Sequence, residues 1–300
     1  MNVRRLIPLV LAGQVLLAQA PPPPPPPPAP PAPPAPMIGV DMPTGGRVET
    51  RTEPLAYGSK LWVKNRNGAI RVTGWDKEQV QLTAVIRDSD KRRINLVVQH
   101  KGADLDIEAV FQQPSWIFGL YVSPRCEMTL QVPRKVLAYF RTTNGAVSVE
   151  SVEGYARCET TNGAITVRDV KGEVQADTTN GAIEASQLFA RIKGGTTNGH
   201  ISLSDVAGGV HLETTNGSIH AENLDGWGEG IRLETTNGRI DVTLGKAKGE
   251  LFAENSNGSL DINVPGAEVL DLSKHSAHLK VPGRSQQIRL ETTNGSIRVR

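Results

Sequence analysis

The stretch V-H-L-E-T-T-N-G-S-I-H-A, residues 210–221, decides the fold of this protein. In its first half, Val210, Leu212 and Thr214 alternate with polar residues, so one strand is predicted to point these three side chains inward. The alternation resumes after the Asn-Gly pair, which predicts a second strand. The pair itself is expected to form a corner, because glycine adopts a positive φ without a Cβ clash and asparagine tolerates the left-handed conformation.

The same Thr-Thr-Asn-Gly motif recurs through residues 142–295 with a period near 18. The first four steps between its asparagines are 18 residues each, the next two are 21 and 20, and the last is 37. We interpret the last step as two periods around a decayed copy at Ser276-Ala277-His278-Leu279. Such regularity is the signature of a repeat architecture. The asparagines predicted to occupy equivalent corners are Asn144, Asn162, Asn180, Asn198, Asn216, Asn237, Asn257 and Asn294.

Two all-β architectures are compatible with one repeat. Asn-Gly between alternating strands is also a hairpin signal, so the local pattern leaves an antiparallel meander open. The recurrence favours a parallel β-solenoid (β-helix) of about 18-residue coils. In a solenoid, equivalent residues stack about 4.8 Å apart, and identical asparagines then form a hydrogen-bonded ladder along the corner. A meander gives no comparable reason to keep the motif unchanged.

The chain divides into three segments. Residues 1–20 are predicted to be a signal peptide, because two arginines precede an apolar stretch that ends in a small-x-small cleavage motif. Residues 21–54 are predicted to be a proline-rich linker and disordered segment, and residues 55–300 the repeat domain. We therefore expect an exported protein of the periplasm, the outer envelope or the extracellular space. Pro21 directly after the cleavage motif leaves an uncleaved N-terminal anchor open as an alternative.

Composition argues against several functional classes. The formal net charge is +2 and no basic stripe is visible, so no nucleic acid partner is expected. Aromatic residues make up 4% of the chain, fewer than an enzyme of this size usually carries. No cofactor is predicted. His275 and His278 are interpreted as surface residues, because a spacing of three on a straight strand places them on opposite faces and not at one metal.

Acidic residues precede the motif in several copies, and stacking would align them as an outward ladder. Their mutual repulsion would be about 1 kcal/mol per neighbouring pair in water, which nearby Arg232, Arg289 and Arg298 could offset. The ladder is interpreted as a solvated charged face, with a cation-binding strip as the alternative. Paired carboxylates for glycoside chemistry cannot be singled out, so we expect no enzyme activity. The acidic residues are Glu159, Asp177, Glu213, Glu234, Glu254 and Glu291.

Cys126 and Cys158 are the two cysteines of the chain, and both fall at inward positions of their predicted strands. The favoured interpretation is a pair of buried thiols that act as small hydrophobic residues. Export would permit a disulfide between them, and this alternative stays open.

Two segments are candidates for contact with a partner. Trp116, Phe118 and Tyr121 lie in an aromatic stretch between strands, which either contacts a partner or pads the end of the solenoid. The sequence ends at Arg300 directly after a full motif, which predicts an unpaired strand edge. Arg298 and Arg300 would blunt that edge, or it would support self-association.

The sequence resembles a known family. The opening V-K-N-R-N-G-A-I-R-V-T-G-W-D at 63–76, the strand M-T-L-Q-V-P at 128–133 and the recurrent N-G-x-I-x-V units are similar to the DUF4097 family over about 55–300. The resemblance implies a β-strand repeat with a solenoid fold on exported or surface proteins, with an adhesin-like role and no catalytic residues.

Together these features predict a non-enzymatic, adhesin-like β-repeat protein that serves as a surface-binding or structural module of the cell envelope. Its partner would be an unknown protein or a glycan surface. An envelope-associated regulatory or scaffold protein that recognises another protein is the alternative. A polysaccharide-active β-helix enzyme is a minor one.

Overall fold

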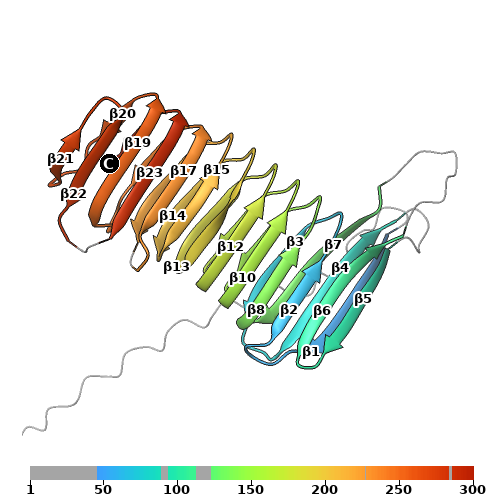
Figure 1. The fold of residues 1–300 in the computed structure, drawn as a ribbon. Helices are drawn as coiled ribbons and strands as arrows, with labels where there is room; N and C mark the ends of the chain where they lie inside the picture. The colour runs from blue at the N-terminus through green and yellow to red at the C-terminus, as the bar shows by residue number, and fades with distance from the viewer. Residues whose placement is uncertain (1–45, 89–93, 113–122, 227, 284–285) are drawn as a thin grey trace, which may run out of the picture. The chain divides into compact units, whose positions relative to one another are not determined.

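The structure is a computed structural model that describes residues 46–88, 94–112, 123–226, 228–283 and 286–300. All of these belong to one compact unit, Met42–Arg300. Within this part of the chain every regular element is a β-strand, and most neighbouring strands are parallel (Figure 1). The predicted all-β class is thereby confirmed. The predicted signal segment, residues 1–20, and most of the predicted linker lie outside the described residues.

The strands form two rows whose inward side chains meet in the core, and each repeat contributes one strand to each row. The first row runs, in spatial order, β5 (Ile94–Lys101), β6 (Asp104–Phe111), β2 (Lys60–Lys64), β8 (Lys135–Arg141), β10 (Glu153–Thr160), β12 (Lys171–Thr178), β13 (Ile183–Thr196), β15 (Val210–Thr214), β17 (Ile231–Asn237), β23 (Gln287–Asn294), β19 (Gly249–Asn257), β22 (Ser276–Val281) and β21 (Glu268–Leu272).

The second row is built in the same way, and β13 bends at Gln187 to take part in both rows. The second row runs β1 (Gly46–Pro54), β4 (Gln79–Arg87), β7 (Arg125–Pro133), β3 (Ile70–Trp75), β9 (Val147–Glu150), β11 (Ile165–Arg168), β13, β14 (Ile201–Ala207), β16 (Ile219–Asp225), β18 (Ile240–Thr243), β24 (Ile297–Val299) and β20 (Leu260–Ile262).

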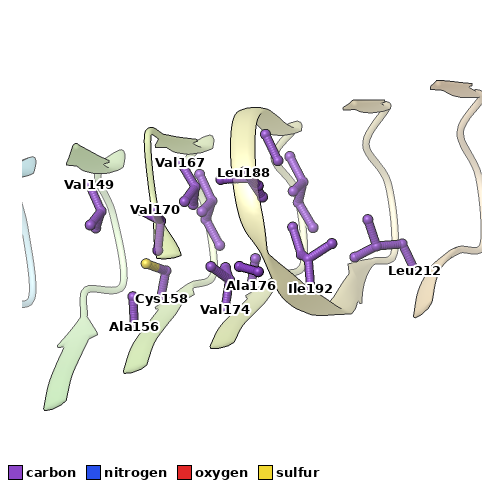
Figure 2. Packing of buried hydrophobic residues seen from close by; sticks show 14 of the residues in the cluster. Val149, Ala156, Cys158, Val167, Val170, Val174, Ala176, Leu188, Ile192 and Leu212 are labelled. Atoms are coloured by element: carbon purple, nitrogen blue, oxygen red, sulfur yellow. The ribbon is translucent and has the colours of Figure 1, made fainter. Parts of the chain in front are cut away.

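Successive repeats pair in parallel and in register, which excludes the antiparallel meander for the central part of the stack. In β10 and β12, Ala156 lies opposite Val174 and Cys158 opposite Ala176, an offset of one 18-residue repeat. Inward side chains therefore stack into columns (Figure 2). Val210, Leu212 and Thr214 are buried as predicted. We call one strand of each row, with the corner that joins them, a coil.

The last coil is not at the end of the stack. β23 lies between β17 and β19, and β24 lies between β18 and β20. The prediction of an unpaired edge at the C-terminal motif, available for self-association, is therefore wrong. The first coil is placed in the same way: β2 lies between β6 and β8, and β3 between β7 and β9. At the N-terminal end, β6 and β7 form outside the first coil before the chain continues on its other side with β8 and β9. At the C-terminal end, the coil of β19 and β20 forms first, and the last coil is then inserted inside it.

Antiparallel strands close both ends of the stack. Residues 276–279 were expected to form a decayed parallel coil, but they begin β22, which is antiparallel to both β19 and β21. At the other end, β1 pairs with β4 antiparallel along residues 46–54, so the predicted linker ends earlier than residue 54. Its last nine residues form a strand because Arg47 reaches the buried carboxylate of Asp88 at 2.9 Å and anchors the segment.

Cys126 and Cys158 are free and buried, so the disulfide alternative is wrong. Cys126 lies on β7 in the second row, and Cys158 lies on β10 in the first row. Three coils separate the two strands, roughly 14 Å along the stack, which is beyond the reach of a disulfide. Burial raises the pKa of each thiol to about 12, so both remain protonated at neutral pH.

Candidate functional site

The predicted corner asparagines form a continuous hydrogen-bonded ladder. Seven of the eight donate from Nδ2 to the Oδ1 of the neighbouring asparagine at 2.8 to 3.0 Å, and all eight side chains are exposed. The sequence located every member but misplaced the last two, because the inserted coil lies between its neighbours. The spatial order is Asn144, Asn162, Asn180, Asn198, Asn216, Asn237, Asn294 and Asn257.

The first threonine of each motif forms a second ladder that the sequence analysis missed. Its hydroxyl donates to the corner glycine carbonyl of the adjacent coil at 2.8 to 3.2 Å. The sequence does carry a signal for this ladder, because the first threonine falls in an inward column of apolar residues. A buried polar side chain there needs a hydrogen-bond partner. In two looser coils an asparagine takes the place of the threonine: Asn65 donates from Nδ2 to the carbonyl oxygen of Cys126 at 2.7 Å, and Asn255 donates to that of Gly295 at 3.5 Å. The buried threonines are Thr142, Thr160, Thr178, Thr196, Thr214, Thr235 and Thr292.

The corner glycines are required for a different reason from the predicted one. Gly145, Gly163 and Gly217 are not among the residues with positive φ. A Cβ on Gly217 would instead lie 1.8 Å from the carbonyl oxygen of Gly199 in the adjacent coil. Close stacking of corner on corner therefore demands glycine here. Left-handed residues lie at the opposite corner, at Ser151, Asp169, Gln187, Asp205 and Asn223.

A groove of about 690 Å³ follows the first row beside these corners, from β12 to β22. We call it the acid–threonine groove, since each coil contributes a carboxylate, a Thr-Thr pair or both to its lining. The predicted acidic ladder is in register here: Glu213 lies opposite Glu234, and Glu234 opposite Glu291. Gly195 interrupts it. The lining acids are Asp177, Glu213, Glu234, Glu291 and Glu254.

Two of the three arginines expected to offset the acidic ladder do so. Arg232 contacts Glu234 and Arg289 contacts Glu291, each within its own strand. Arg298 instead lies on β24 in the second row and donates to Asp261 at 2.8 Å, so this part of the expectation is wrong. Because two acids are already paired with arginines, the groove is mixed in charge and not a bare anionic strip.

A second hollow of about 430 Å³ adjoins the same face, and its lining includes Arg191, Lys193, Arg232 and Arg289. Lys193, His211, Arg232 and Arg289 follow one another in register across four strands. Lys193 pairs with Glu173 at 2.8 Å. This face of the molecule therefore carries a basic row beside an acidic row.

The aromatic residues expected to contact a partner, Trp116, Phe118 and Tyr121, lie outside the described residues. A different aromatic group lies on the first row. The rings of Trp62 and Tyr139 are stacked, with centroids 5.4 Å apart and an interplanar angle of 14°. Tyr155 continues the group at 5.4 Å. The rings cover one another across adjacent strands, so they stabilise the stack as a ladder.

The histidines show no metal-binding arrangement. His275 contacts the Oδ1 of Asn255 through Nδ1 at 2.9 Å, and the ring of His278 stacks on Phe252 at 4.2 Å between centroids. Across the residues that the structure describes, no group of three or more His, Cys, Asp or Glu side chains could hold a metal. The same residues include no helix long and apolar enough to cross a membrane.

The parallel stack, the corner ladders and the antiparallel ends define a toastrack-like β-repeat protein. The family model described as toastrack DUF4097 matches residues 59–300, and the chain belongs to this family. The expected family is thereby confirmed. No functionally curated protein is similar enough to match the chain.

A solved structure of low sequence identity shares the fold, and others are similar with lower scores. A putative adhesin from Bacteroides fragilis NCTC 9343 is 12% identical, with a TM-score of 0.51, over 85% of this chain and 97% of that one. A putative lipid binding protein from Parabacteroides distasonis ATCC 8503 is 13% identical, with a TM-score of 0.48, over 83% and 96%. A putative adhesin from the same organism is 12% identical, with a TM-score of 0.33, over 85% and 98%.

Proposed function

We propose that this protein is an exported, non-catalytic, adhesin-like binding module of the cell envelope, built as a parallel β-solenoid. The observation that carries the proposal is the acid–threonine groove, which repeats one set of polar groups along the stack. Descriptions of two similar structures as putative adhesins agree with this role.

The dimensions of the groove favour an extended ligand. It spans seven strands of the first row, from β12 through β13, β15, β17, β23 and β19 to β22. At about 4.8 Å per strand, this is roughly 30 Å. A compact metabolite would fill a small part of it, whereas a polymer chain could follow its length.

The chemistry of the groove favours a glycan chain. A typical coil offers a carboxylate, which accepts hydrogen bonds, and a threonine hydroxyl, which both donates and accepts. Sugar hydroxyls need both kinds of partner. Thr215 and Thr236, the second threonines of two adjacent coils, are exposed in the lining. A repeating ligand would meet the same groups at each step.

The ladders hold this surface rigid before a ligand arrives. The asparagine and threonine hydrogen bonds connect every coil along the groove to its neighbour. A preformed surface loses little conformational entropy on binding, so weak contacts repeated along a polymer can add up. This favours a recognition module over an enzyme, for which the groove offers no evident acid–base pair.

Glycan arrays and pull-downs with envelope polysaccharides test the proposal. Thr215→Arg combined with Thr236→Arg would fill the groove and should abolish binding. Thr243→Arg, an exposed threonine on the second row, is the matched control and should bind normally. Equal binding by both variants would place the site elsewhere.

Turnover of a bound glycan that the groove variant loses would overturn the non-catalytic assignment. Cell fractionation tests export.

A further inference from the structure

One edge of the first row is both unpaired and apolar. Among the described residues, β21 pairs only with β22, so its other edge has no strand beside it. All five residues of β21 are exposed. Three of these five residues are large and apolar: Val269, Leu270 and Leu272 are 56%, 47% and 63% exposed. An open edge of this composition is a surface for strand pairing.

The apolar character of β21 continues the protein core. Val269 lies opposite Leu279, and Leu272 lies opposite Ala277, and both partners are buried inward residues of β22. Leu270 is the extra residue of a β-bulge between them. The second row stops at β20, which pairs only with β24 among the described strands. The inward face of β21 therefore extends past the last strand that could cover it.

At the opposite end of the stack, the edge strand of the second row is protected. The edge strand β1 carries Arg47, Glu49, Arg51 and Glu53 and ends at Pro54, and charge and proline are the usual means of preventing edge pairing. Val48 is the exposed large hydrophobic residue on β1, at 48%. The edge strands β1 and β21 thus differ: β1 is blunted by charge, and β21 presents three apolar side chains.

We propose that β21 pairs antiparallel with β21 of a second copy of this chain, around a two-fold axis between Leu270 and Asp271. In this arrangement Val269 of each copy lies opposite Leu272 of the other, so inward residue meets inward residue despite the bulge. The contact is isologous and closes on itself. It also continues the alternation of β19, β22 and β21, in which each strand is antiparallel to the one before.

Charge complementarity supports a second copy as the occupant. Glu268 begins β21, and Lys274 lies two residues beyond its end. An antiparallel pair brings Glu268 of each copy beside the Ser273–Lys274 end of the other, which gives two favourable contacts by symmetry. Among the described residues, neither Glu268 nor Lys274 forms an ion pair within its own chain. Asp271 lies near the axis in both copies and weakens the contact.

Sedimentation velocity over a concentration series tests the proposal. The chain is expected to form a dimer, and Leu272→Lys should raise the dimer dissociation constant roughly tenfold or more, the equivalent of about 1.4 kcal/mol. Val48→Lys makes the same kind of change on β1 and should leave the constant unchanged. Asp271→Asn should lower it. Circular dichroism of each variant checks that the fold is retained.

A charge exchange separates pairing from misfolding. Glu268→Lys and Lys274→Glu should each weaken the dimer, and the double variant should restore it, because each copy then presents the reversed pair. A monomer at every concentration, an unaffected Leu272→Lys dimer or a failure of the double variant to restore association would overturn the proposal. Loss of association in Val48→Lys would move the contact to β1, and open-ended polymers would exclude a two-fold contact.

Discussion

The hydroxyl of Thr292 donates to the carbonyl oxygen of Gly238 at 3.0 Å, although the two residues are 54 positions apart. This bond places the last coil directly against the coil of β17, and the coil of β19 is displaced outward. Between sequential coils the same bond joins residues 15 or 18 positions apart, as between Thr214 and Gly199 at 3.0 Å. The stack therefore uses one local geometry for both sequential and inserted neighbours.

Loss of the threonine hydroxyl should be costly only where it is buried. Thr214→Val removes the donor to Gly199 and leaves a buried carbonyl without its partner, which should cost about 1–2 kcal/mol. Thr215→Val is the matched control, because this adjacent threonine is exposed, and it should change stability by less than about 0.5 kcal/mol. Urea denaturation of both variants measures the difference. Equal effects would contradict the assigned ladder.

Asn216→Ala should destabilise the protein by about 1–2 kcal/mol, since it removes two ladder bonds, to Asn198 and from Asn237, both at 2.9 Å. The matched control is Asn95→Ala on β5, where the asparagine is exposed. Chemical denaturation measures both. A loss at Asn216 no larger than that at Asn95 would show that the exposed ladder contributes nothing to stability.

Gly217→Ala should cost about 3 kcal/mol, because the new Cβ would lie 1.8 Å from the Gly199 carbonyl oxygen and the backbone must shift. Gly102→Ala separates this clash from conformational strain. Gly102 has a φ of +68°, and no atom lies within 4 Å of the place that a methyl group would occupy, so the cost there should be about 1–2 kcal/mol. Thermal unfolding of the Gly217→Ala and Gly102→Ala variants measures the two losses of stability. An effect at Gly217 no larger than that at Gly102 would contradict the assigned clash between coils.

Stability should fall in strongly alkaline solution through the two buried thiols. Burial raises the pKa of Cys126 and Cys158 from 9.0 to about 12 in the folded protein. The folded state therefore binds more protons than the unfolded state between these values, and stability present below pH 9 is lost as pH rises toward 12. The slope of unfolding free energy against pH measures this. Cys126→Ala with Cys158→Ala should reduce it, and an unchanged slope would contradict the assignment.

Deletion of residues 287–300 should unfold the far end of the stack and not simply shorten it. β23 and β24 lie inside the stack, so their removal takes both ladders away from β19 and β20. Hydrogen exchange should show loss of protection at residues 249–281 as well. Retained protection there would mean that β19 can pair with β17 directly.

The sequence predicts the unit of this fold well but not the order of its units. Alternation around Leu212 and the recurring Asn-Gly pair are enough to predict inward faces, parallel stacking and the asparagine ladder. The order fails at Asn257 and Asn294, because equivalent motifs are interchangeable as neighbours. What distinguishes the outer coil is a weakened motif, with Asn255 in place of threonine.

The ends and the glycines could not be predicted for other physical reasons. β1 is polar and charged, so its pairing depends on Arg47 and the buried Asp88, 41 residues away, and not on a hydrophobic period. The Asn-Gly pairs correctly predicted the positions of the corners. Glycine is required there, however, because adjacent coils approach too closely to leave room for a Cβ. The distance between coils is a tertiary quantity, which no single repeat contains.

The inserted last coil determines how the molecule would respond to a pulling force. A load applied at Arg300 acts on β24, which is hydrogen-bonded to β18 on one side and to β20 on the other. Such a load must shear two ladders at once. A load applied at Gly46 acts on β1, which is bonded only to β4 among the described strands and can peel away one bond at a time. The two ends of the folded unit should therefore yield at very different forces.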